Sequence, residues 1–370
     1  MEELRIIISG GGTGGHIFPA VSIANAIKSL RPDAKILFVG AEGRMEMTRV
    51  PAAGYEIKGL PIRGLYRPLW SPKNFGVMRD FFKSKKIVKG ILKEFKPQVA
   101  VGVGGYASSA TLNAAYSLGI PCLIQEQNSF AGLTNKSLAH KAEKICVAYE
   151  GMERFFPKDR IVLTGNPVRQ NLLNPLKSKE ECKREFNLDE TKPVILLIGG
   201  SLGAKTLNDS VLLGMDKIAA SDAQFIWQTG GYYKNSIAEE LSKKKKPANL
   251  IVTDFISNMA EAYHAADLVI SRAGASSISE LCLLGKPSIL VPSPNVAEDH
   301  QTHNAMALVN KDAALYVKDA EAREKLIPLA LETVKDNKKL ESLGHNAQTM
   351  AFTDSAEVIA EMVVNLARRS

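Results

Sequence analysis

Short apolar runs alternate with stretches of helical periodicity along most of the chain. The first run, residues 4–9, is rich in isoleucine and is typical of a buried parallel strand. Five glycines follow between Gly10 and Gly15, and a helical pattern begins near Pro19. This order of strand, turn and helix recurs down the sequence. The alternation predicts an α/β protein with parallel sheets and helices on both faces.

The first part of the chain contains one complete set of such elements. Its predicted strands are residues 4–9, 35–39, 99–103, 122–125 and 161–163, and its predicted helices begin near residue 19 and cover 75–95 and 109–118. The breakers Gly165-Asn166-Pro167 come next, followed by a polar, charged segment that extends to Lys192. Such a cluster of turn residues indicates a domain boundary.

The pattern restarts after this boundary. A strand at 194–198, a glycine-rich turn at 199–204 and a helix from about Thr206 repeat the opening of the chain. A strand at 268–271 and a helix at 276–284, followed by Gly-Lys-Pro, repeat the order seen at 99–125. We therefore predict two similar Rossmann-like domains. In such sheets ligands lie outside the carboxyl ends of the strands, so both glycine loops are expected to line one interdomain cleft.

Composition narrows the class of protein. The 370 residues are 45% hydrophobic and 23% charged, which suits a globular chain of two domains. The four cysteines show no C-x-x-C spacing, so we expect neither a disulfide framework nor a zinc site. The opening residues lack a basic leader, and no apolar run approaches the length of a membrane span, which predicts a cytoplasmic location. A net charge of +8 favours an anionic partner, either nucleic acid, nucleotide or acidic lipid.

The first glycine loop allows several interpretations. Gly10, Gly12 and Gly15 have the G-x-G-x-x-G spacing of dinucleotide-binding folds, but no acidic residue ends the second predicted strand. No Lys-Ser or Lys-Thr follows the glycines, so the P-loop pattern is absent. His16 stands at the mouth of the loop, where an imidazole suits proton transfer. The alternative, that His16 only packs against the start of the helix, stays open.

Six motifs, in order along nearly the whole chain, resemble those of the MurG family. They are residues 11–16 (GGTGGH), 104–106 (GGY), 125–128 with 132–135 (QEQN and GLTN), 165–169 (GNPVR), 199–201 (GGS) and 272–280. This family of bacterial enzymes adds N-acetylglucosamine to lipid I, the undecaprenyl-pyrophosphoryl muramoyl-pentapeptide, to make lipid II in peptidoglycan synthesis. The resemblance implies a GT-B fold and an inverting transfer from UDP-N-acetylglucosamine.

The resemblance also implies a domain organisation and a set of partners. Residues 1–165, completed by a C-terminal helix within 350–370, would face the lipid acceptor and the membrane, and residues 166–349 would bind the donor. UDP-N-acetylglucosamine is a substrate, so no cofactor is expected. The implied partners are UDP-N-acetylglucosamine, lipid I and an anionic membrane surface at the cytoplasmic face of the plasma membrane. Other cell-wall synthesis proteins are left open as partners, and nucleic acid is not expected.

Individual site residues follow from the resemblance. Donor contacts are implied for Thr13, Gly14, Gly15, Asn128, Arg169, Ser201, Ile256, Ala275, Ser276, Ser277, Ile278, Ser279, Glu280 and Gln301, and the acceptor side for Gly104, Gly105 and Tyr106. We predict that His16 is the catalytic base and that Glu126 is a catalytic or orienting carboxylate. Gln125 stands where many members carry a histidine, which leaves His16 better placed as the base.

The leaving pyrophosphate requires stabilisation of its negative charge by a metal, by cations or by a helix N-terminus. The sequence has no D-x-D pair, so we expect no metal and assign this task to Ser201, Arg169 and the helix that starts at Ala275-Ser276. Glu280, one helical turn further on, suits the two hydroxyls of a ribose.

Several of these residues also have purely structural interpretations. Ser276, Ser277 and Ser279 form a pattern typical of N-capping. Arg272 and Glu280 are spaced so that they could pair across a turn, and Ile256 is of a type more often found in a core. His300 and His303 lack the glutamate of the H-E-x-x-H zinc motif, so we interpret them as part of a polar loop.

Residues 63–96 combine basic and apolar side chains. The segment holds ten lysines and arginines against two acidic residues. Met78, Phe81, Val88, Leu92 and Phe95 keep a helical spacing and are predicted to be mostly core. One buried helical stripe leaves no place for four further apolar residues, Leu69, Trp70, Phe75 and Phe82. We expect these four to contact an anionic bilayer. The alternative for residues 63–96 is a basic face exposed to solvent. For the basic run at residues 243–246, a solvent-exposed loop is the preferred interpretation.

Two further classes of function remain. UDP-N-acetylglucosamine 2-epimerases share the two-domain architecture, but they need no lipid acceptor and give no reason for the surplus apolar residues of 69–82. A non-enzymatic nucleic-acid binder is suggested only by the net charge, since no nucleic-acid-binding signature is present.

Overall fold

The computed structural model describes residues 3–64, 66, 70–168, 172, 177–200 and 202–368. The chain forms two compact units: unit 1 is residues 1–168 with 352–370, and unit 2 is residues 169–351. Three residues of the predicted site and membrane surface, Leu69, Arg169 and Ser201, lie outside the described part. Within that part, none of the helices has the length and apolar character needed to cross a membrane.

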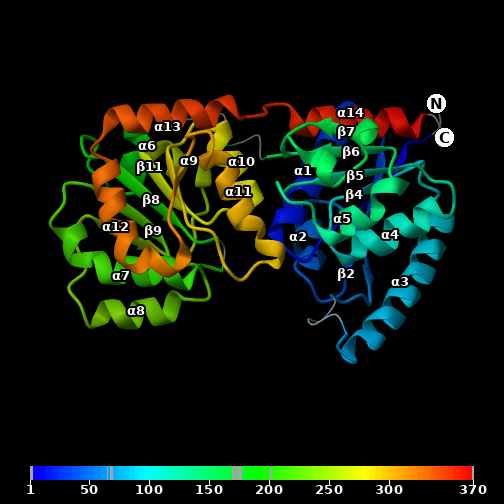
Figure 1. The fold of residues 1–370 in the computed structure, drawn as a ribbon, viewed down its shortest axis with the longest axis horizontal. Coiled ribbons are helices and arrows are strands. Elements are labelled where there is room, and N and C mark those ends of the chain that lie inside the picture. The colour runs from blue at the N-terminus through cyan, green and yellow to red at the C-terminus, as the bar shows by residue number, and fades with distance from the viewer. Residues whose placement is uncertain are drawn as a thin grey trace. The chain divides into compact units, whose positions relative to one another are not determined.

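Unit 1 is built on a parallel sheet of seven strands in the order β3-β2-β1-β4-β5-β6-β7 (Figure 1). The strands are β1 (Arg5–Ser9), β2 (Lys35–Ala41), β3 (Glu56–Leu60), β4 (Val99–Gly102), β5 (Cys122–Glu126), β6 (Lys144–Val147) and β7 (Ile161–Leu163). The helices are α1 (Gly14–Leu30), α2 (Glu46–Ala52), α3 (Lys73–Phe95), α4 (Tyr106–Tyr116), α5 (Leu133–Leu138) and α14 (Ser355–Ala367). The strands predicted from the apolar runs are confirmed to within a few residues at each end.

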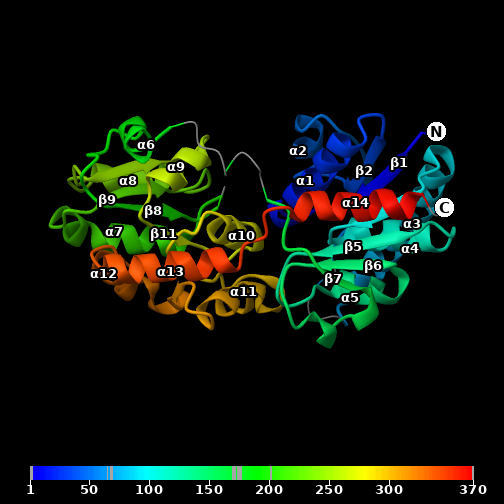
Figure 2. The same ribbon diagram turned by 90° about the horizontal axis from the view of Figure 1, so that it is seen from above.

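Helices cover both faces of this sheet because successive strand side chains point to opposite sides. Ile6 and Ile8 of β1 pack in one core with α1 and α14, whereas Ile7 packs in the other core with α3 and α4. The helices α1 and α14 come from the two ends of the chain and lie side by side (Figure 2). The C-terminal helix therefore completes a core that the N-terminal strand begins.

Unit 2 repeats this design with six parallel strands in the order β10-β9-β8-β11-β12-β13. The strands are β8 (Val194–Ile198), β9 (Gln224–Gln228), β10 (Leu250–Thr253), β11 (Leu268–Ser271), β12 (Ser288–Leu290) and β13 (Leu315–Tyr316). The helices are α6 (Lys179–Glu185), α7 (Lys205–Ala219), α8 (Lys234–Ser242), α9 (Met259–Ala265), α10 (Ala275–Leu283), α11 (His300–Val309), α12 (Ala322–Thr333) and α13 (Asn337–Thr349). Leu197 and Trp227 belong to a core that α7 and α12 cover.

Two helix starts differ from the prediction. Helix α1 begins at Gly14, five residues before Pro19, because Thr13 in extended conformation ends the turn and already accepts backbone hydrogen bonds from His16 and Ile17. Helix α4 begins at Tyr106, directly after Gly105, instead of at Ser109. In both places glycine suggested a continuing loop, since it is a poor helix former. The consequence is that Gly14, Gly15 and His16 lie in the first helical turn.

Candidate functional site

A buried carboxylate holds the turn between β1 and α1. Gly12 has φ +88° and donates its backbone N–H to Oε2 of Glu46 at 2.9 Å. The Oε1 atom of Glu46 accepts from the backbone N–H of Ala41 at 3.0 Å, at the end of β2. Glu46 has no exposed surface, and a Cβ on Gly11 would lie 2.1 Å from its carboxylate. Glu46 therefore fixes the path of the glycine turn.

Sequence reasoning missed Glu46. The sequence analysis found no acidic residue at the end of the second predicted strand, since the nearest one, the exposed Glu42, lies beyond it. The available signal was the position of Glu46 between Met45 and Met47, because a charged residue flanked by apolar ones at the start of a helix is a candidate for burial. A buried carboxylate requires hydrogen-bond donors, and backbone N–H groups of a glycine turn supply them.

His16 lies between two glycine turns of unit 1. Its Nδ1 atom is 2.9 Å from the carbonyl oxygen of Gly11 and 3.4 Å from Oγ1 of Thr13. A carbonyl oxygen only accepts, so Nδ1 carries the proton and the lone pair of the neutral ring lies on Nε2. A Cβ added to Gly104 would be 2.8 Å from Nε2. The basic nitrogen of His16 is thus directed toward the predicted acceptor residues.

The second turn of unit 1 requires glycine. Gly104 and Gly105 have φ values of +97° and +85°, and a Cβ on Gly105 would lie 2.6 Å from the carbonyl oxygen of Gly11. Tyr106 opens α4, is half exposed, and has its ring against Gly64. The structure therefore brings the three predicted acceptor-side residues close to the first glycine turn.

Glu126 organises the loop after β5. Its buried carboxylate accepts from the backbone N–H groups of Asn128 and Gly132, each at 3.0 Å, and from Nδ2 of Asn135 at 2.9 Å. Nδ2 of Asn128 also donates to it, at 3.2 Å. A carboxylate with these donors around it is suited to holding a loop and less suited to moving a proton. The contacts are those of an orienting group, and they fix the position of Asn128.

Buried amides join three segments of unit 1. Gln125 donates from Nε2 to Oδ1 of Asn166 at 2.9 Å, and Asn166 donates from Nδ2 to the carbonyl oxygen of Gln127 at 3.0 Å. Gln127 donates from Nε2 to the carbonyl oxygen of Val103 at 2.9 Å and also to Oε1 of Gln125. The network ties the end of β4, the end of β5 and the segment after β7. Gln125 thus has a structural role at the position noted above as a departure from the family pattern.

The glycine-rich turn of unit 2 lies between β8 and α7. Gly200 and Gly203 have φ values of +83° and +86°, and a Cβ on Gly203 would lie 2.0 Å from the carbonyl oxygen of Thr229. That oxygen accepts from Nδ2 of Asn208 at 2.9 Å, and Oδ1 of Asn208 accepts from the indole N–H of Trp227, also at 2.9 Å. Neutral groups therefore support this turn.

Helix α10 carries most of the predicted donor residues. It begins at Ala275 after Gly274, whose extended backbone forms the N-cap position without any side-chain cap. Ser279 donates to the carbonyl oxygen of Ala275 at 3.0 Å, and the Oγ atom of Ser276 is buried without a hydrogen-bond partner among the described residues. The N-capping interpretation of these serines is therefore wrong. Ser277 lies in the same first turn, and Ile278 is buried in the core of the unit.

Two charged residues of this region have partners within unit 2. Glu280 is buried and accepts a hydrogen bond at 3.0 Å from the hydroxyl of Tyr263. Arg272 forms its ion pair with Asp319 at 2.5 Å and also donates to the carbonyl oxygen of Val291 at 3.0 Å. Arg272 thus links the ends of β11 and β12 to the segment after β13.

The remaining predicted donor residues lie on other segments of unit 2. Ile256 is buried in the loop after β10. Gln301 accepts from the backbone N–H of Ser293 through Oε1 at 2.8 Å. His300 and His303 belong to the first turn of α11, so the interpretation as a polar loop is wrong. Within the described ranges, no three His, Cys, Asp or Glu side chains gather as metal ligands would.

An apolar and basic surface covers the first half of α3 and the residue Trp70. Trp70 and Phe75 are each 85% exposed and Phe82 is 62% exposed. Met78, predicted to be mostly core, is 46% exposed, so that prediction is wrong: Val77 is buried in its place and Met78 shares the exposed face with Phe75 and Phe82. The exposed cations Arg79, Lys83 and Lys86 lie on the same helix.

Two protein-family models match this chain, and so does a curated relative along nearly its full length. Residues 6–147 match the model of the glycosyltransferase family 28 N-terminal domain, and residues 194–359 match the model of its C-terminal domain. The chain is 64% identical to a protein of Phocaeicola vulgatus named UDP-N-acetylglucosamine--N-acetylmuramyl-(pentapeptide) pyrophosphoryl-undecaprenol N-acetylglucosamine transferase. That match covers 99% of this chain and 97% of the relative.

Known structures of other proteins have the same overall fold as this chain. The crystal structure of MurG from Acinetobacter baumannii matches with a TM-score of 0.78 and 26% identity, covering 98% of this chain and 99% of that one. A putative UDP-N-acetylglucosamine 2-epimerase from Listeria monocytogenes matches with a TM-score of 0.70 at 10% identity, covering 97% of this chain and 95% of that one. The second likeness shows the fold alone. Together these structures confirm the predicted GT-B fold class.

Proposed function

The chain belongs to the MurG family, and we propose that it carries out the reaction of that family, the transfer of N-acetylglucosamine from UDP-N-acetylglucosamine to lipid I to form lipid II. The observation that carries this proposal is the full-length match to the relative from Phocaeicola vulgatus, which includes both glycine-rich turns and α10. No comparable observation favours an epimerase or a nucleic-acid binder.

The two units are assigned different substrates. Unit 1, predicted as residues 1–165 with 350–370, is proposed to bind lipid I through Gly104, Gly105 and Tyr106. Unit 2, predicted as residues 166–349, is proposed to bind UDP-N-acetylglucosamine. Thr13, Gly14, Gly15 and Asn128 of unit 1 are proposed to reach the same donor. This division follows the family pattern, and the supporting fact from the structure is that the acceptor-side residues adjoin His16 within unit 1.

His16 is proposed to be the general base. Because Nδ1 donates to the carbonyl oxygen of Gly11, Nε2 is the nitrogen that can take a proton. It would accept the proton of the 4-hydroxyl of the muramoyl sugar while that oxygen attacks the anomeric carbon of N-acetylglucosamine. UDP would leave from the opposite face, which inverts the configuration. Glu126 would act through Asn128 as an orienting residue.

Unit 2 is proposed to stabilise the charge on the leaving UDP without a metal ion. The N-terminus of α10 offers free backbone N–H groups and the positive end of the helix dipole. Within this first turn, the buried Oγ atom of Ser276 has no partner among the described residues, which suits a ligand contact. Glu280 would accept from a ribose hydroxyl beside its bond from Tyr263. Ser201, Arg169, Ile256 and Gln301 complete the proposed donor contacts.

The exposed surface of α3 is proposed to dock on the cytoplasmic face of the plasma membrane. Trp70, Phe75, Met78 and Phe82 give an apolar patch, and Arg79, Lys83 and Lys86 give positive charge beside it. Such a combination favours the interface of an anionic bilayer. Peripheral binding would bring unit 1 to its lipid-linked acceptor. Leu69 is assigned to the same surface from its place in the sequence alone.

The test of the proposed function is transfer of labelled N-acetylglucosamine from UDP-N-acetylglucosamine to a lipid I analogue, with a chelator present and with a control that omits the acceptor. We expect product that depends on the acceptor and survives chelation. Donor that is epimerised or hydrolysed without acceptor would overturn the proposal in favour of an epimerase. Loss of the product on chelation would overturn the metal-free site and leave the transfer reaction intact.

A further inference from the structure

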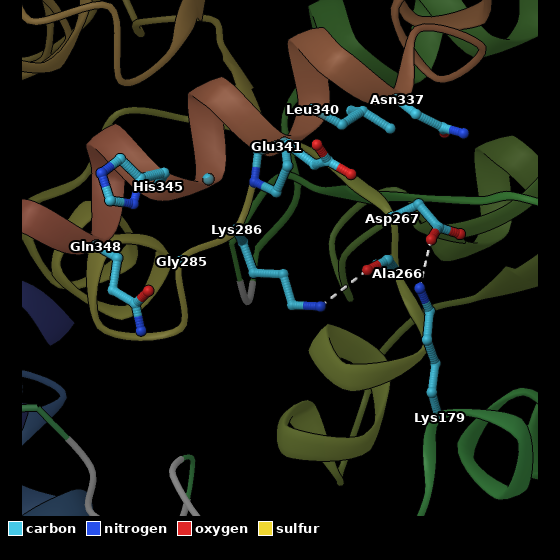
Figure 3. Close-up of a pocket in the computed structure, with 12 residues that line it drawn as sticks. Lys179, Ala266, Asp267, Gly285, Lys286, Asn337, Leu340, Glu341, His345 and Gln348 are labelled. Atoms are coloured by element: carbon cyan, nitrogen blue, oxygen red, sulfur yellow. Dashed lines mark hydrogen bonds and ion pairs between the residues drawn. The ribbon is translucent and has the colours of Figure 1, made fainter.

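Unit 2 contains an open pocket of about 510 Å³ beside the amino ends of β11 and β12. Ala266 and Asp267 directly precede β11, and Lys286 and Pro287 directly precede β12. Helix α13 forms the other wall, as Figure 3 shows. The predicted donor residues follow the carboxyl end of β11, so this cavity is separate from the proposed donor site. We name it the Lys286 pocket.

Lys286 is a half-buried ammonium group with few partners. Its Nζ atom donates to the carbonyl oxygen of Ala266 at 2.9 Å (Figure 3). Throughout the described part of the chain, no carboxylate oxygen comes within ion-pair distance of this atom. Burial, together with the nearby positive charge of Lys179, lowers the pKa of Lys286 to about 8. A partly buried ammonium whose N–H donors lack partners raises the free energy of the folded state unless an anion binds to it.

The nearest acid in the pocket is already neutralised by other groups. Asp267 pairs with Nζ of Lys179 at 2.5 Å and accepts from the backbone N–H of Val194 at 2.8 Å. Nζ of Lys183 lies 3.9 Å from its other oxygen. Glu341 is on the exposed side of α13, at the rim of the pocket. Asp267 therefore compensates the charge of the Lys286 ammonium only in part.

We propose that the Lys286 pocket binds a tetrahedral oxyanion of the phosphate type, with the Lys286 ammonium as its charge partner. Charge-assisted hydrogen bonds from the unused N–H groups would replace the hydration that Lys286 loses. His345 and Gln348 of α13 also line the pocket, but in Figure 3 the Lys286 side chain points away from them, toward Ala266. The volume is in the range of small-molecule sites, so a small phosphate ester fits as well as the free ion.

The proposal predicts a linked pH effect. The titratable groups around Lys286 are Lys179 and Cys182 of α6, His264 of α9, Asp267, and Glu341 and His345 of α13. A bound anion favours the charged form of Lys286 and therefore raises its pKa. Affinity for an anion of fixed charge should fall as the pH rises above about 8, where Lys286 loses its proton.

The first measurement is the rate of acetylation of Lys286 by acetic anhydride, followed by mass spectrometry from neutral to alkaline pH. Sulfate is the probe because its charge is constant in this range, and chloride at matched ionic strength is the control. Near pH 8 we expect sulfate to slow the reaction about fivefold, since a nearby opposite charge raises a lysine pKa by about one unit or more. The exposed Lys245 serves as the internal reference and should show no such protection.

Substitutions then test the same site through thermal unfolding. Sulfate should raise Tm more than chloride does in the parent chain, and Lys286→Met should markedly reduce that difference by weakening sulfate binding about tenfold. Glu341→Gln should enlarge the difference, because it removes a negative charge from the rim. Lys245→Met is the matched control and should leave the difference unchanged.

The proposal fails if sulfate and chloride protect Lys286 equally, or if Lys286→Met keeps the whole sulfate-specific rise in Tm. Glucose 6-phosphate, used as a second probe, distinguishes the source of the anion. Stronger protection than with sulfate supports a phosphorylated small molecule as the occupant, and equal protection supports the free ion. These readouts need neither UDP-N-acetylglucosamine nor lipid I, so they are independent of the proposed function.

Discussion

The glycine-rich turns after β1 and β8 hold equivalent positions in the two units but are fixed by different chemistry. In unit 1 the turn is held by the buried carboxylate of Glu46, and His16 lies in the helical turn that follows. In unit 2 the equivalent turn packs against the carbonyl oxygen of Thr229, which Asn208 and Trp227 hold in place through neutral hydrogen bonds.

The same strand, glycine turn and helix therefore carry different side-chain chemistry in the two units. Both turns present backbone N–H groups and a helix start, which suits them to phosphate and sugar groups. The turn of unit 1 is followed by the imidazole of His16, bonded so that Nε2 can take a proton. We therefore expect substitutions in unit 1 to affect turnover and substitutions in unit 2 to affect donor affinity.

The largest expected effect is that of His16→Ala. Removing a general base typically lowers the rate by about 10²- to 10⁴-fold, and we expect kcat to fall within that range. Binding of UDP-N-acetylglucosamine, measured by titration calorimetry, should stay close to that of the parent chain. Near-normal turnover at neutral pH with intact donor binding would show that His16 only packs against the helix.

Glu46→Gln tests whether the carboxylate defines the turn of unit 1. The amide can accept from only one of the N–H groups of Gly12 and Ala41, and its own NH₂ would meet the other. Denaturant unfolding should show a loss of about 1.5–3 kcal/mol, as for hydrogen bonds to charged groups.

The Glu46 variant should also lower kcat more than it raises the KM of the donor, because it displaces His16 through the turn. The matched control is Glu42→Gln, at an exposed position four residues earlier, which should change stability by less than about 0.5 kcal/mol. Equal losses of stability and kcat in the two variants would show that Glu46 does not define the turn of unit 1.

Asn208→Leu is the corresponding change in unit 2. It leaves the buried indole N–H of Trp227 and the carbonyl oxygen of Thr229 without their partner, at a cost of about 1–3 kcal/mol in stability. Steady-state kinetics should show a raised KM for UDP-N-acetylglucosamine with little change in kcat. A fall in kcat at unchanged KM would break the proposed division between the units.

The smallest expected effect concerns the membrane. Lys83→Ala removes one exposed cation beside Phe82 in unit 1 and should weaken flotation with anionic vesicles about fivefold, the usual contribution of one cation near such a surface. Lys245→Ala, in the basic run of unit 2, should have no effect. Flotation that does not depend on anionic lipid would refute docking through α3.

Strands buried on both faces appear as continuous apolar runs, and from such runs the sequence predicted β1, β2, β4, β5, β8 and β11. It did not assign β3, β6, β9 and β10. The strands at residues 194–198 and 268–271 were predicted with the bounds that the structure shows for β8 and β11. Helix starts at glycine were misplaced, as Gly14 shows, since local propensity argued for a loop where tertiary packing makes a helix.

The candidate site was predictable only in part. His16 and Glu126 stood out as ionisable residues beside glycine turns and strand ends. For Glu46 the local pattern indicates at most burial, because its partners Gly12 and Ala41 come from other segments of the chain. The exposure of Met78 was missed because Val77 next to it satisfies the same helical stripe one position earlier. The roles of these residues in catalysis remain predictions.

The most direct test of the central claim is the pH dependence of kcat for acceptor-dependent transfer, compared between the parent chain and His16→Ala. A base must be neutral to take a proton, so the rate of the parent chain should fall as the pH drops through the range of about 5 to 8, in which histidine titrates. His16→Ala should lose this acidic limb and retain a low, flat rate. The same acidic limb in both proteins would contradict the account and place the base elsewhere.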